Sequence, residues 1–502
     1  MAGNRIRDER VAKLAALRAV GVEPYGEKVE RTATIREVRG LCLEDGTEGA
    51  QPPVTTVAGR VTAARNMGKS CWLDLRDQSG RIQVNLLQKR LGDDYNLVKQ
   101  LDIGDFIAAT GSLMKSRVGE ITVFADSFRF LSKSLEPLPA KFKGLKDVEI
   151  RYRRRYLDMV ASDEVRERFI LRSRIIGFVR RRLDELGFLE VETPMLQPIY
   201  GGAAARPFIT HHNALDMDLF LRISPETYLK RLLVGGIDRV YELNRNFRNE
   251  GIDTSHNPEF TMIELYQAYA DFTDMMTLLE NLVSDAAQTL LGTTKIRFAG
   301  HEVDVKAPWP RRRIQDLVRE VGGTDPGNAD AMRGRLAKAG LDCGKLAHLD
   351  IDKLVMKIMD EIIEPQLIQP TIVTHHPASL NPLSKRNREN PALSDRFEAI
   401  VCGFELSNAF SELNDPLEQR ARFESQVGSR DEESYCDQVD DDYVSALEVG
   451  MPPAGGMGIG IDRLVMLLTG QPGIREVVLF PTLKAKSKEE VEREMEALTD
   501  GE

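Results

Sequence analysis

The chain has 502 residues, of which 42% are hydrophobic and 29% are charged, an ordinary balance for a globular protein. This composition excludes a disordered chain, a collagen and a small disulfide scaffold, and roughly 150 residues per domain predicts about three parts. The net charge of −10 argues mildly against nucleic-acid binding, although it says nothing of how the charges are distributed.

No membrane-spanning or secretory segment is visible in the sequence. No apolar run approaches the ~20 residues needed to span a bilayer, and the charged segment Met1–Arg10 lacks the apolar stretch of a signal peptide. The five cysteines are scattered, with no Cys-x-x-Cys pair among them: Cys42, Cys71, Cys343, Cys402 and Cys436. We therefore expect a cytoplasmic protein with reduced thiols.

The first third of the chain predicts a helix followed by a small barrel. Residues 6–22 have apolar positions at helical spacing, and Gly21 is a stop signal for this predicted helix. Five short apolar runs follow, with a helix-like segment, Tyr95–Leu101, between the third and the fourth: Val57–Val61, Cys71–Leu75, Ile82–Leu86, Phe106–Gly111 and Ile121–Phe130. This order is typical of a five-stranded OB β-barrel, which often binds single-stranded nucleic acid and also occurs as a passive module.

The rest of the chain alternates helical and strand-like segments. The predicted helices are Val165–Leu186, Pro225–Val234, Asp271–Leu291, Ile351–Ile363 and Pro416–Ser429. The predicted strands are Arg239–Arg245, Glu259–Tyr266, Phe397–Leu406 and Val477–Phe480. Grouped strands favour an α+β fold with an antiparallel sheet over a doubly wound one. We divide the chain into a helical extension (1–53), the barrel (54–135), a basic hinge (136–155) and a large α+β domain (156–502).

Two runs of basic residues stand out against the acidic whole. Lys141–Arg155 carries seven Lys or Arg residues, and seven arginines lie between Arg166 and Arg182. A solvated surface explains such runs, and so does a stripe that contacts phosphates. The sequence leaves both explanations open.

Two further segments indicate a ligand site. The alternation around residues 246–266 predicts a strand–loop–strand hairpin that points Arg248, Glu264 and Tyr266 to one side. A guanidinium, a histidine and aromatic rings on one face suit a nucleotide, although a structural salt bridge would also explain Arg248. Near the C-terminus, the glycine-rich run Gly455–Gly460 allows close backbone approach to a ligand and is followed by Arg463.

Three segments resemble the signature motifs of class II aminoacyl-tRNA synthetases. Gly187–Pro194 resembles motif 1, Phe247-Arg-x-Glu250 motif 2, and Gly458–Arg463 motif 3. The barrel is similar to that of the subclass containing the lysyl, aspartyl and asparaginyl enzymes. Further segments make nearly the whole chain resemble bacterial-type lysyl-tRNA synthetases: Val148–Asp158, Gly201–Asn213, Phe247–Tyr266 and Phe410–Asp415.

The resemblance implies an ATP site. In it Arg248 holds the α-phosphate and the amino-acid carboxylate, Arg463 grips the γ-phosphate, and Phe260 stacks on adenine. The other implied ATP contacts are Glu250, His256, Asn257, Glu398, Glu405 and Gly460. Of these, Glu398 and Glu405 are implied to hold Mg²⁺, which prefers a few carboxylates together with phosphate oxygens.

The resemblance also implies a pocket for L-lysine. Its implied residues are Gly202, Glu226, Arg248, Glu264, Tyr266, Asn408, Phe410 and Glu412. A buried ammonium needs carboxylate partners, so we expect Glu264 and Glu412 at the ε-ammonium, with Tyr266 adding a hydrogen bond. Glu226 and the Gly202 carbonyl would take the α-ammonium. A pocket for aspartate would need the opposite charge.

The implied activity has two steps and no side-chain nucleophile. Lysine and ATP form lysyl-adenylate, and the lysyl group then passes to the 3′ end of tRNA(Lys). The resemblance further implies a homodimer through motif 1 and an anticodon site on the barrel, formed by Arg60, Arg65, Trp72 and Gln83. For Trp72, a place in the barrel core remains an alternative.

One segment departs from the family pattern. Ser407 and Ala409 stand where we expect two glycines, and Ala409 is expected to lie close to the pocket and tighten it. The alternatives to a lysine enzyme are an aspartyl or asparaginyl enzyme of the same subclass, a paralogue that passes activated lysine to another acceptor, and a tRNA- or nucleotide-binding module without catalysis. His375 and His376 are interpreted as loop or core histidines rather than zinc ligands.

Overall fold

The computed structural model describes residues 2–42, 51–138, 145, 147–429, 438–487 and 489–490. The chain separates into two compact units, Met1–Asp163 with Lys484–Glu502, and Glu164–Leu483. Three lysines of the predicted basic hinge fall outside the described residues: Lys141, Lys143 and Lys146. Cys436, in another part of the chain, also falls outside them. In the described ranges, no helix is long and apolar enough to cross a membrane.

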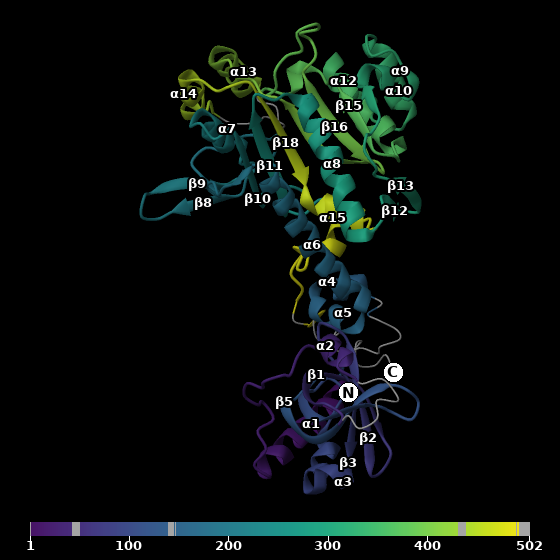
Figure 1. Cartoon of the computed structure of the whole chain (residues 1–502). Helices are drawn as coiled ribbons and strands as arrows, with labels where there is room; N and C mark the ends of the chain where they lie inside the picture. Colours follow the sequence, from purple (N-terminus) through teal and green to yellow (C-terminus); the bar gives the residue numbers. More distant parts are fainter. Residues whose placement is uncertain are drawn as a thin grey trace. The chain divides into compact units, whose positions relative to one another are not determined.

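The first unit contains a closed five-stranded barrel with the strand order β1-β2-β3-β5-β4 (Figure 1). Its strands are β1 (Val54–Asn66), β2 (Ser70–Arg76), β3 (Arg81–Leu87), β4 (Phe106–Lys115) and β5 (Ile121–Ser132). Its helices are α1 (Ala2–Ala19), α2 (Ile35–Gly40), α3 (Gln88–Leu91), a 3₁₀ helix (Gly92–Gln100), α4 (Val148–Arg153) and α5 (Arg155–Ala161). All five predicted strands are confirmed, and the helix-like segment between the third and fourth is the 3₁₀ helix.

The two-residue period of the barrel strands decides which side chains face outward. Leu73 and Val84 are buried in the barrel core, whereas Trp72 is half-buried and pairs in register with Asn85 of β3. The core alternative for Trp72 is therefore wrong, because successive side chains of a strand point to opposite faces.

The second unit is built on an eight-stranded sheet with the order β14-β15-β16-β17-β18-β11-β10-β6. Its strands are β6 (Leu189–Glu190), β10 (Arg239–Phe247), β11 (Glu259–Ala268), β14 (Arg311–Arg313), β15 (Thr371–Thr374), β16 (Arg396–Val401), β17 (Phe404–Ser411) and β18 (Ala454–Gly460). The pairs from β15 to β10 are antiparallel, as predicted for an α+β fold, and β6 and β14 are parallel to their neighbours. Two small sheets contain β7 (Leu196–Gln197), β8 (Ile209–His212) and β9 (Met217–Leu221), and β12 (Lys295–Phe298) and β13 (His301–Asp304).

Helices cover both faces of this sheet (Figure 1). They are α6 (Asp163–Glu185), α7 (Glu226–Val234), α8 (Phe272–Leu291), α9 (Ile314–Glu320), α10 (Ala329–Lys338), α11 (Cys343–Leu346), α12 (Ile351–Ile358), α13 (Pro416–Ser429), α14 (Asp441–Val449), α15 (Ile461–Thr469) and α16 (Ile474–Val477). The largest hydrophobic core combines residues of α6, α8 and α15 with one face of the central strands. The opposite face of those strands is free to carry polar groups.

Three predicted elements differ from the structure. Phe397–Leu406 is not one strand but the hairpin of β16 and β17, which turns at Cys402 and Gly403 with positive φ angles of 51° and 72°. The run Val477–Phe480 forms no strand; Val477 is instead the last residue of helix α16. The predicted helix Ile351–Ile363 changes into a π-helical turn at Met359.

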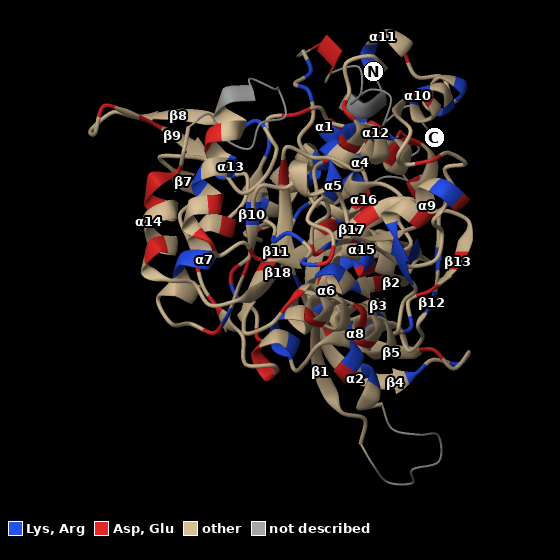
Figure 2. Cartoon of the chain, turned by 90° about the horizontal axis from the view of Figure 1, so that it is seen from above, with Lys and Arg blue, Asp and Glu red and all other residues tan. Residues whose placement is uncertain are grey.

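The arginine run of α6 is engaged in ion pairs within its own unit. Arg168 lies 2.5 Å from Glu476, Arg172 lies 2.6 Å from Asp462, and Arg180 lies 2.9 Å from Glu190. Elsewhere basic and acidic residues are interspersed along the helices (Figure 2). These three arginines therefore have structural partners.

The substitution Ile263→Ala tests the core face of the sheet. Ile263 is fully buried on β11, so the change should remove about 2–5 kcal/mol of stability through lost burial and a cavity. The control Arg245→Ala removes only a surface ion pair with Glu259, worth ~0–1 kcal/mol. Calorimetric melting measures both variants; equal melting temperatures would contradict the assignment of this face to the core.

Candidate active site

The polar face of the central sheet forms the floor of the site. In register, Glu264 of β11 lies beside Gly458 of β18, which lies beside Asn408 of β17, which lies beside Glu398 of β16. Side chains opposite one another on antiparallel strands share a face, so the side chains of Glu264, Asn408 and Glu398 point to the same face of the sheet. The next row is Tyr266, Gly456, Phe410 and Arg396.

The glycines of β18 make room on this floor. A Cβ atom at Gly456 would overlap the Glu412 carboxylate and the Tyr266 ring. A Cβ at Gly458 would lie 3.2 Å from the Met262 side chain. The glycine-rich run therefore admits the protein's own large side chains across the floor, in addition to allowing a ligand to approach the backbone.

Two neighbouring cavities lie over the floor and share five lining residues: Arg248, Met262, Glu405, Asn408 and Gly458. We call them the nucleotide-side cavity and the carboxylate-side cavity. The predicted ATP contacts that line the first are Arg248, Glu250, His256, Asn257, Phe260, Glu405, Gly460 and Arg463. The predicted residues that line the second are Gly202, Glu226, Arg248, Glu264, Tyr266, Glu398, Glu405, Asn408 and Phe410.

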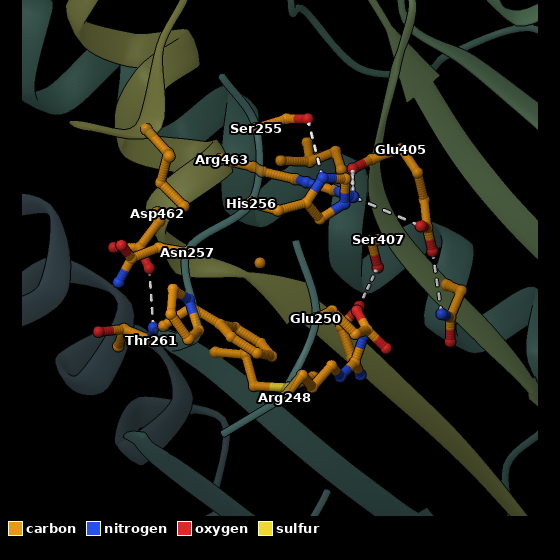
Figure 3. Close-up of a pocket in the computed structure, with 18 of the residues that line it drawn as sticks. Arg248, Glu250, Ser255, His256, Asn257, Thr261, Glu405, Ser407, Asp462 and Arg463 are labelled. Carbon is orange, nitrogen blue, oxygen red and sulfur yellow. Dashed lines mark hydrogen bonds and ion pairs between the residues drawn. The ribbon is translucent and has the colours of Figure 1, made fainter. Parts of the chain in front are cut away.

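Two arginines, Arg248 and Arg463, bring positive charge to the nucleotide-side cavity (Figure 3). Arg248 follows the end of β10, where its backbone N–H donates to the Pro258 carbonyl, and its guanidinium lies 5.1 Å from the centre of the Phe260 ring. Its buried Nε has no hydrogen-bond partner among the described residues. A guanidinium whose buried Nε donor is free is suited to an anion, so the salt-bridge alternative for Arg248 has no support here.

Arg463 enters the cavity from the first turn of α15. It donates to the backbone carbonyl of Glu405 at 2.5 Å and approaches its carboxylate at 3.4 Å. Its other nitrogen lies 3.4 Å from Nε2 of His256, whose Nδ1 pairs with Asp253 at 2.8 Å. Figure 3 shows Arg463, His256 and Glu405 together on one side of the cavity, apart from Arg248 and Glu250.

Glu398 stays ionised although it is buried. Burial raises the pKa of this carboxyl, but His376 and Arg396 outweigh burial and hold the pKa at about 2. Arg396 lies 2.6 Å from one oxygen and His376 lies 3.3 Å from the other. His376, predicted as a loop or core histidine, is buried and pairs with this proposed metal ligand.

Acidic groups are in surplus beside Glu398 and Glu405. Burial and the charge of Glu398 raise the pKa of Asp360 to about 7, and burial and Glu405 raise the pKa of Glu364 to about 8. In the described part of the chain, no three His, Cys, Asp or Glu side chains are arranged to hold a metal ion by themselves. A cation held here would take Glu398 and Glu405 and draw its other ligands from a substrate.

Two buried carboxylates, Glu226 and Glu264, line the carboxylate-side cavity, and a third, Glu412, lies beside its lining residue Gly456. Glu264 accepts hydrogen bonds from Ser224 at 2.8 Å and from Tyr266 at 3.0 Å. Burial and the charge of Glu226 raise the pKa of Glu264 to about 7. Glu412 is fully buried, lies over Gly456, and pairs with the buried ammonium of Lys230. The site thus holds more negative charge than its own cations neutralise.

The two departures from the family pattern have different outcomes. Ser407 donates a hydrogen bond to the Gly458 carbonyl at 2.7 Å and lines the nucleotide-side cavity. Ala409 is fully buried in the hydrophobic core on the other face of the sheet. The expectation that Ala409 lies close to the pocket is therefore wrong, because it alternates with Asn408 and Phe410.

On the barrel, Trp72 and Gln83 share the outer face with Asp74 and Asn85, with which they pair in register. The Trp72 ring makes an edge contact with Phe124 at 6.2 Å, and Gln83 accepts a hydrogen bond from Thr122.

The two predicted barrel arginines differ in their surroundings. Arg65 is exposed and lies opposite Trp72. Arg60 stacks at 4.3 Å on Phe106 and donates to the Gly104 carbonyl. The outer face therefore brings Arg65 beside Trp72, whereas Arg60 contacts its own barrel.

Sequence analysis missed several residues of the site. Arg396 stands two residues before Glu398 on one strand, and Lys230 stands four residues after Glu226 on a helix. Both spacings put the two side chains on one face, so the periodicity could have found them. His376 approaches Glu398 only through tertiary structure.

Comparison with protein families identifies the fold. The model described as "tRNA synthetases class II (D, K and N)" matches residues 147–484, and the model of the "OB-fold nucleic acid binding domain" matches residues 55–131. The chain belongs to this family of class II tRNA synthetases, which confirms the family resemblance and the fold class.

Individual relatives narrow the similarity further. The chain is 53% identical over 490 residues to the lysine–tRNA ligase of Pelotomaculum thermopropionicum, an alignment that covers 96% of each protein. It is 51% identical to the lysine–tRNA ligase of Carboxydothermus hydrogenoformans, with 96% of this chain and 99% of the relative covered. The ligase of Syntrophomonas wolfei is 49% identical, with 97% and 98% covered.

Proposed function

We propose that this protein activates L-lysine with ATP and transfers it to tRNA(Lys), as a lysine–tRNA ligase. The observation that carries the choice of lysine is the surplus of buried carboxylates around one cavity: Glu226, Glu264 and Glu412. Buried carboxylates need cationic partners, and lysine brings two ammonium groups. An aspartate side chain would add negative charge to the same place. The full-length similarity to curated lysine–tRNA ligases supports the same choice.

The substrate lysine is proposed to lie across the carboxylate-side cavity. Its α-ammonium would meet Glu226 and the Gly202 carbonyl, and its ε-ammonium would meet Glu264, Tyr266 and Glu412. At Gly202 a Cβ atom would lie 2.8 Å from Ser224 Oγ, so glycine keeps this wall close to Glu226. Asn408 and Phe410 would complete the floor, with Asn408 and Arg248 at the lysine carboxylate.

Activation is proposed to proceed by in-line attack. The lysine carboxylate attacks the α-phosphorus of ATP, pyrophosphate leaves, and lysyl-adenylate forms; a terminal ribose hydroxyl of the tRNA then attacks the acyl carbon and releases AMP. Arg248 stands where the two cavities meet, so it can hold both the carboxylate and the α-phosphate. Arg463 would hold the γ-phosphate. The chain's contribution is positioning and charge stabilisation.

The remaining nucleotide contacts are proposed from the lining of the same cavity: Glu250, His256, Asn257, Phe260 and Gly460. Phe260 offers its ring to adenine. Glu398 and Glu405 fit Mg²⁺ because they are two carboxylates beside a phosphate site, with surplus acidic charge around them. When bound, the ion would neutralise phosphate charge.

The barrel is proposed to bind the anticodon. Trp72 would stack on a base, Gln83 would hydrogen-bond to it, and Arg60 and Arg65 would contact phosphates. The exposed place of Arg65 beside Trp72 supports this role, while Arg60 would have to leave its contact with Phe106.

A homodimer through Gly187–Pro194 is proposed as well. Its support is the exposure of Leu189, which is 53% accessible, and of the neighbouring Leu196, which is 46% accessible. Since ATP and tRNA are the proposed substrates, the cytoplasm is the proposed place of action.

Exchange between ATP and pyrophosphate tests the proposal directly, with each standard amino acid in turn and no tRNA. Lysine alone should support exchange. Arg463→Ala should lower kcat about 100- to 1000-fold, as expected for one lost preorganised donor, while Arg245→Ala should leave it unchanged. Exchange with aspartate or asparagine would contradict the lysine assignment, and no exchange with or without tRNA would favour the binding module.

The pH dependence of the lysine KM tests Glu264. Its raised pKa means that the carboxyl is neutral below pH of about 7 and ionised above it. Because the lysine ammonium binds the ionised form, KM should rise by up to about tenfold per pH unit as the pH falls below 7. The charged or titratable groups facing Glu264 are Glu226, Tyr266, Arg222 and Glu412. Glu264→Gln should abolish this dependence; an unchanged pH profile in that variant would contradict the role.

Trp72→Ala tests the barrel separately from the chemistry. Loss of one stacked base should weaken the binding of tRNA(Lys) by ~1–3 kcal/mol. The KM for tRNA(Lys) in the charging reaction should therefore rise about 5- to 150-fold. Exchange without tRNA should not change. Tyr25→Ala, which removes another exposed aromatic of the same unit, is the matched control. Equal effects of both variants on charging would contradict an anticodon role for Trp72.

A further inference from the structure

Lys230 is a buried cation that joins two carboxylates of the site. Its side chain is 0% exposed, and its Nζ lies 2.5 Å from Glu226 and forms a second ion pair with Glu412. Lys230 does not line either cavity. A ligand in the carboxylate-side cavity would therefore meet Glu226 directly and would meet Glu412 over Gly456, which lines the cavity, but would not meet the ammonium between the two carboxylates.

The surroundings keep Lys230 charged and fixed. Burial lowers the pKa of its ammonium, but Glu226 and Glu412 outweigh burial and raise that pKa above its ordinary value. The rings of Phe410 and Tyr266 lie 5.4 Å and 5.9 Å from Nζ, within reach of cation–π attraction. The ammonium is thus enclosed by two carboxylates and two aromatic rings.

The two carboxylates come from different parts of the fold. Glu226 begins α7 and lies one turn before Lys230 on the same helix, so the helix fixes these two residues relative to each other. Glu412 follows the end of β17 and shares no element with them. Backbone pairing with Ala454 and Ser384 holds the main chain of Glu412. Two like charges repel, and the shared ammonium is the side-chain contact that joins the Glu412 carboxylate to that of Glu226.

We propose that Lys230 fixes the separation of Glu226 and Glu412 and so sets the length of the diamino acid that the enzyme activates, which disfavours ornithine. This inference rests on the proposed function, in which Glu226 meets the α-ammonium and Glu412 the ε-ammonium. Ornithine is one methylene shorter than lysine, so it reaches both carboxylates only if Glu412 moves inward. Lys230 opposes that movement and acts as a positioning residue.

The ratio of kcat/KM for lysine to kcat/KM for ornithine, measured by ATP–pyrophosphate exchange, tests this role. Lys230→Met keeps the length and apolar packing of the side chain and removes the charge. The ratio should fall about tenfold or more, since one methylene supplies ~10- to 200-fold discrimination. The KM for lysine should rise, whereas the KM for ATP at saturating lysine should stay within about twofold. Both amino acids are assayed with the same enzyme preparation, so the ratio does not depend on the fraction of the enzyme that is folded.

Arg231→Met is the matched control on the same helix. Arg231 pairs with Asp442 at 2.6 Å and Asp440 at 3.1 Å, where α7 and α14 lie side by side (Figures 1 and 2). The substitution removes a cation next in sequence to Lys230, and Arg231 lines neither cavity. The lysine-to-ornithine ratio should equal that of the unaltered enzyme.

Tyr443→Phe provides a milder variant if Lys230→Met does not fold. Tyr443 is fully buried, in the same hydrophobic cluster as the Phe410 and Tyr266 rings that enclose Lys230. Phenylalanine keeps the packing and removes the hydroxyl, so the ratio should fall about threefold.

The outcomes separate this inference from the proposed function. An unchanged ratio in the folded variants, or equal rises in the KM for lysine and for ATP, would overturn the role of Lys230. An unaltered enzyme without lysine-dependent exchange would instead overturn the proposed function. Rescue of the ratio by Lys230→Arg, which restores the charge, would support the inference.

Discussion

The pairing of the glycine-rich strand β18 with β11 and β17 is the constraint on which the rest of the site depends. Its register puts Gly456 and Gly458 between Tyr266 and Glu264 on one side and Phe410 and Asn408 on the other. Only residues without side chains leave space there, because a Cβ at Gly456 would overlap Glu412. The same two-residue period sends Ile459 and Met457 into the core. The residues of β18 thus alternate between the hydrophobic core on one face of the sheet and the candidate site on the other.

Charge is distributed unequally over that reactive face. Arg248 and Arg463 bring two guanidinium groups to the nucleotide-side cavity, whereas Glu226 and Glu264 line only the carboxylate-side cavity. Burial, together with the charge of Glu226, raises the pKa of Glu264 in that cavity. A site built this way favours ligands that bring phosphate to one side and ammonium groups to the other, which is the combination that lysine and ATP supply.

Two elements show why sequence patterns failed locally. Phe397–Leu406 is apolar almost throughout, and periodicity cannot tell one long strand from two that meet in a tight turn. The turn depends on positive φ at Cys402, which gives no turn signal, and at Gly403, a single glycine that is also compatible with a continuous strand. Since the hairpin folds back, Glu398 and Glu405 lie on adjacent strands and line one cavity, which their spacing of seven could not indicate.

The sequence by itself determined the barrel, the α+β class and the family, because strand periodicity and three ordered motifs are local properties of the chain. It also named most of the residues that line the two cavities. Tertiary structure alone decided that His376 faces Glu398 and that Ala409 faces the core rather than the pocket. It also decided that Lys230 bridges Glu226 and Glu412. The physical reason is that buried charges find their partners across elements far apart in sequence, where no local period relates them.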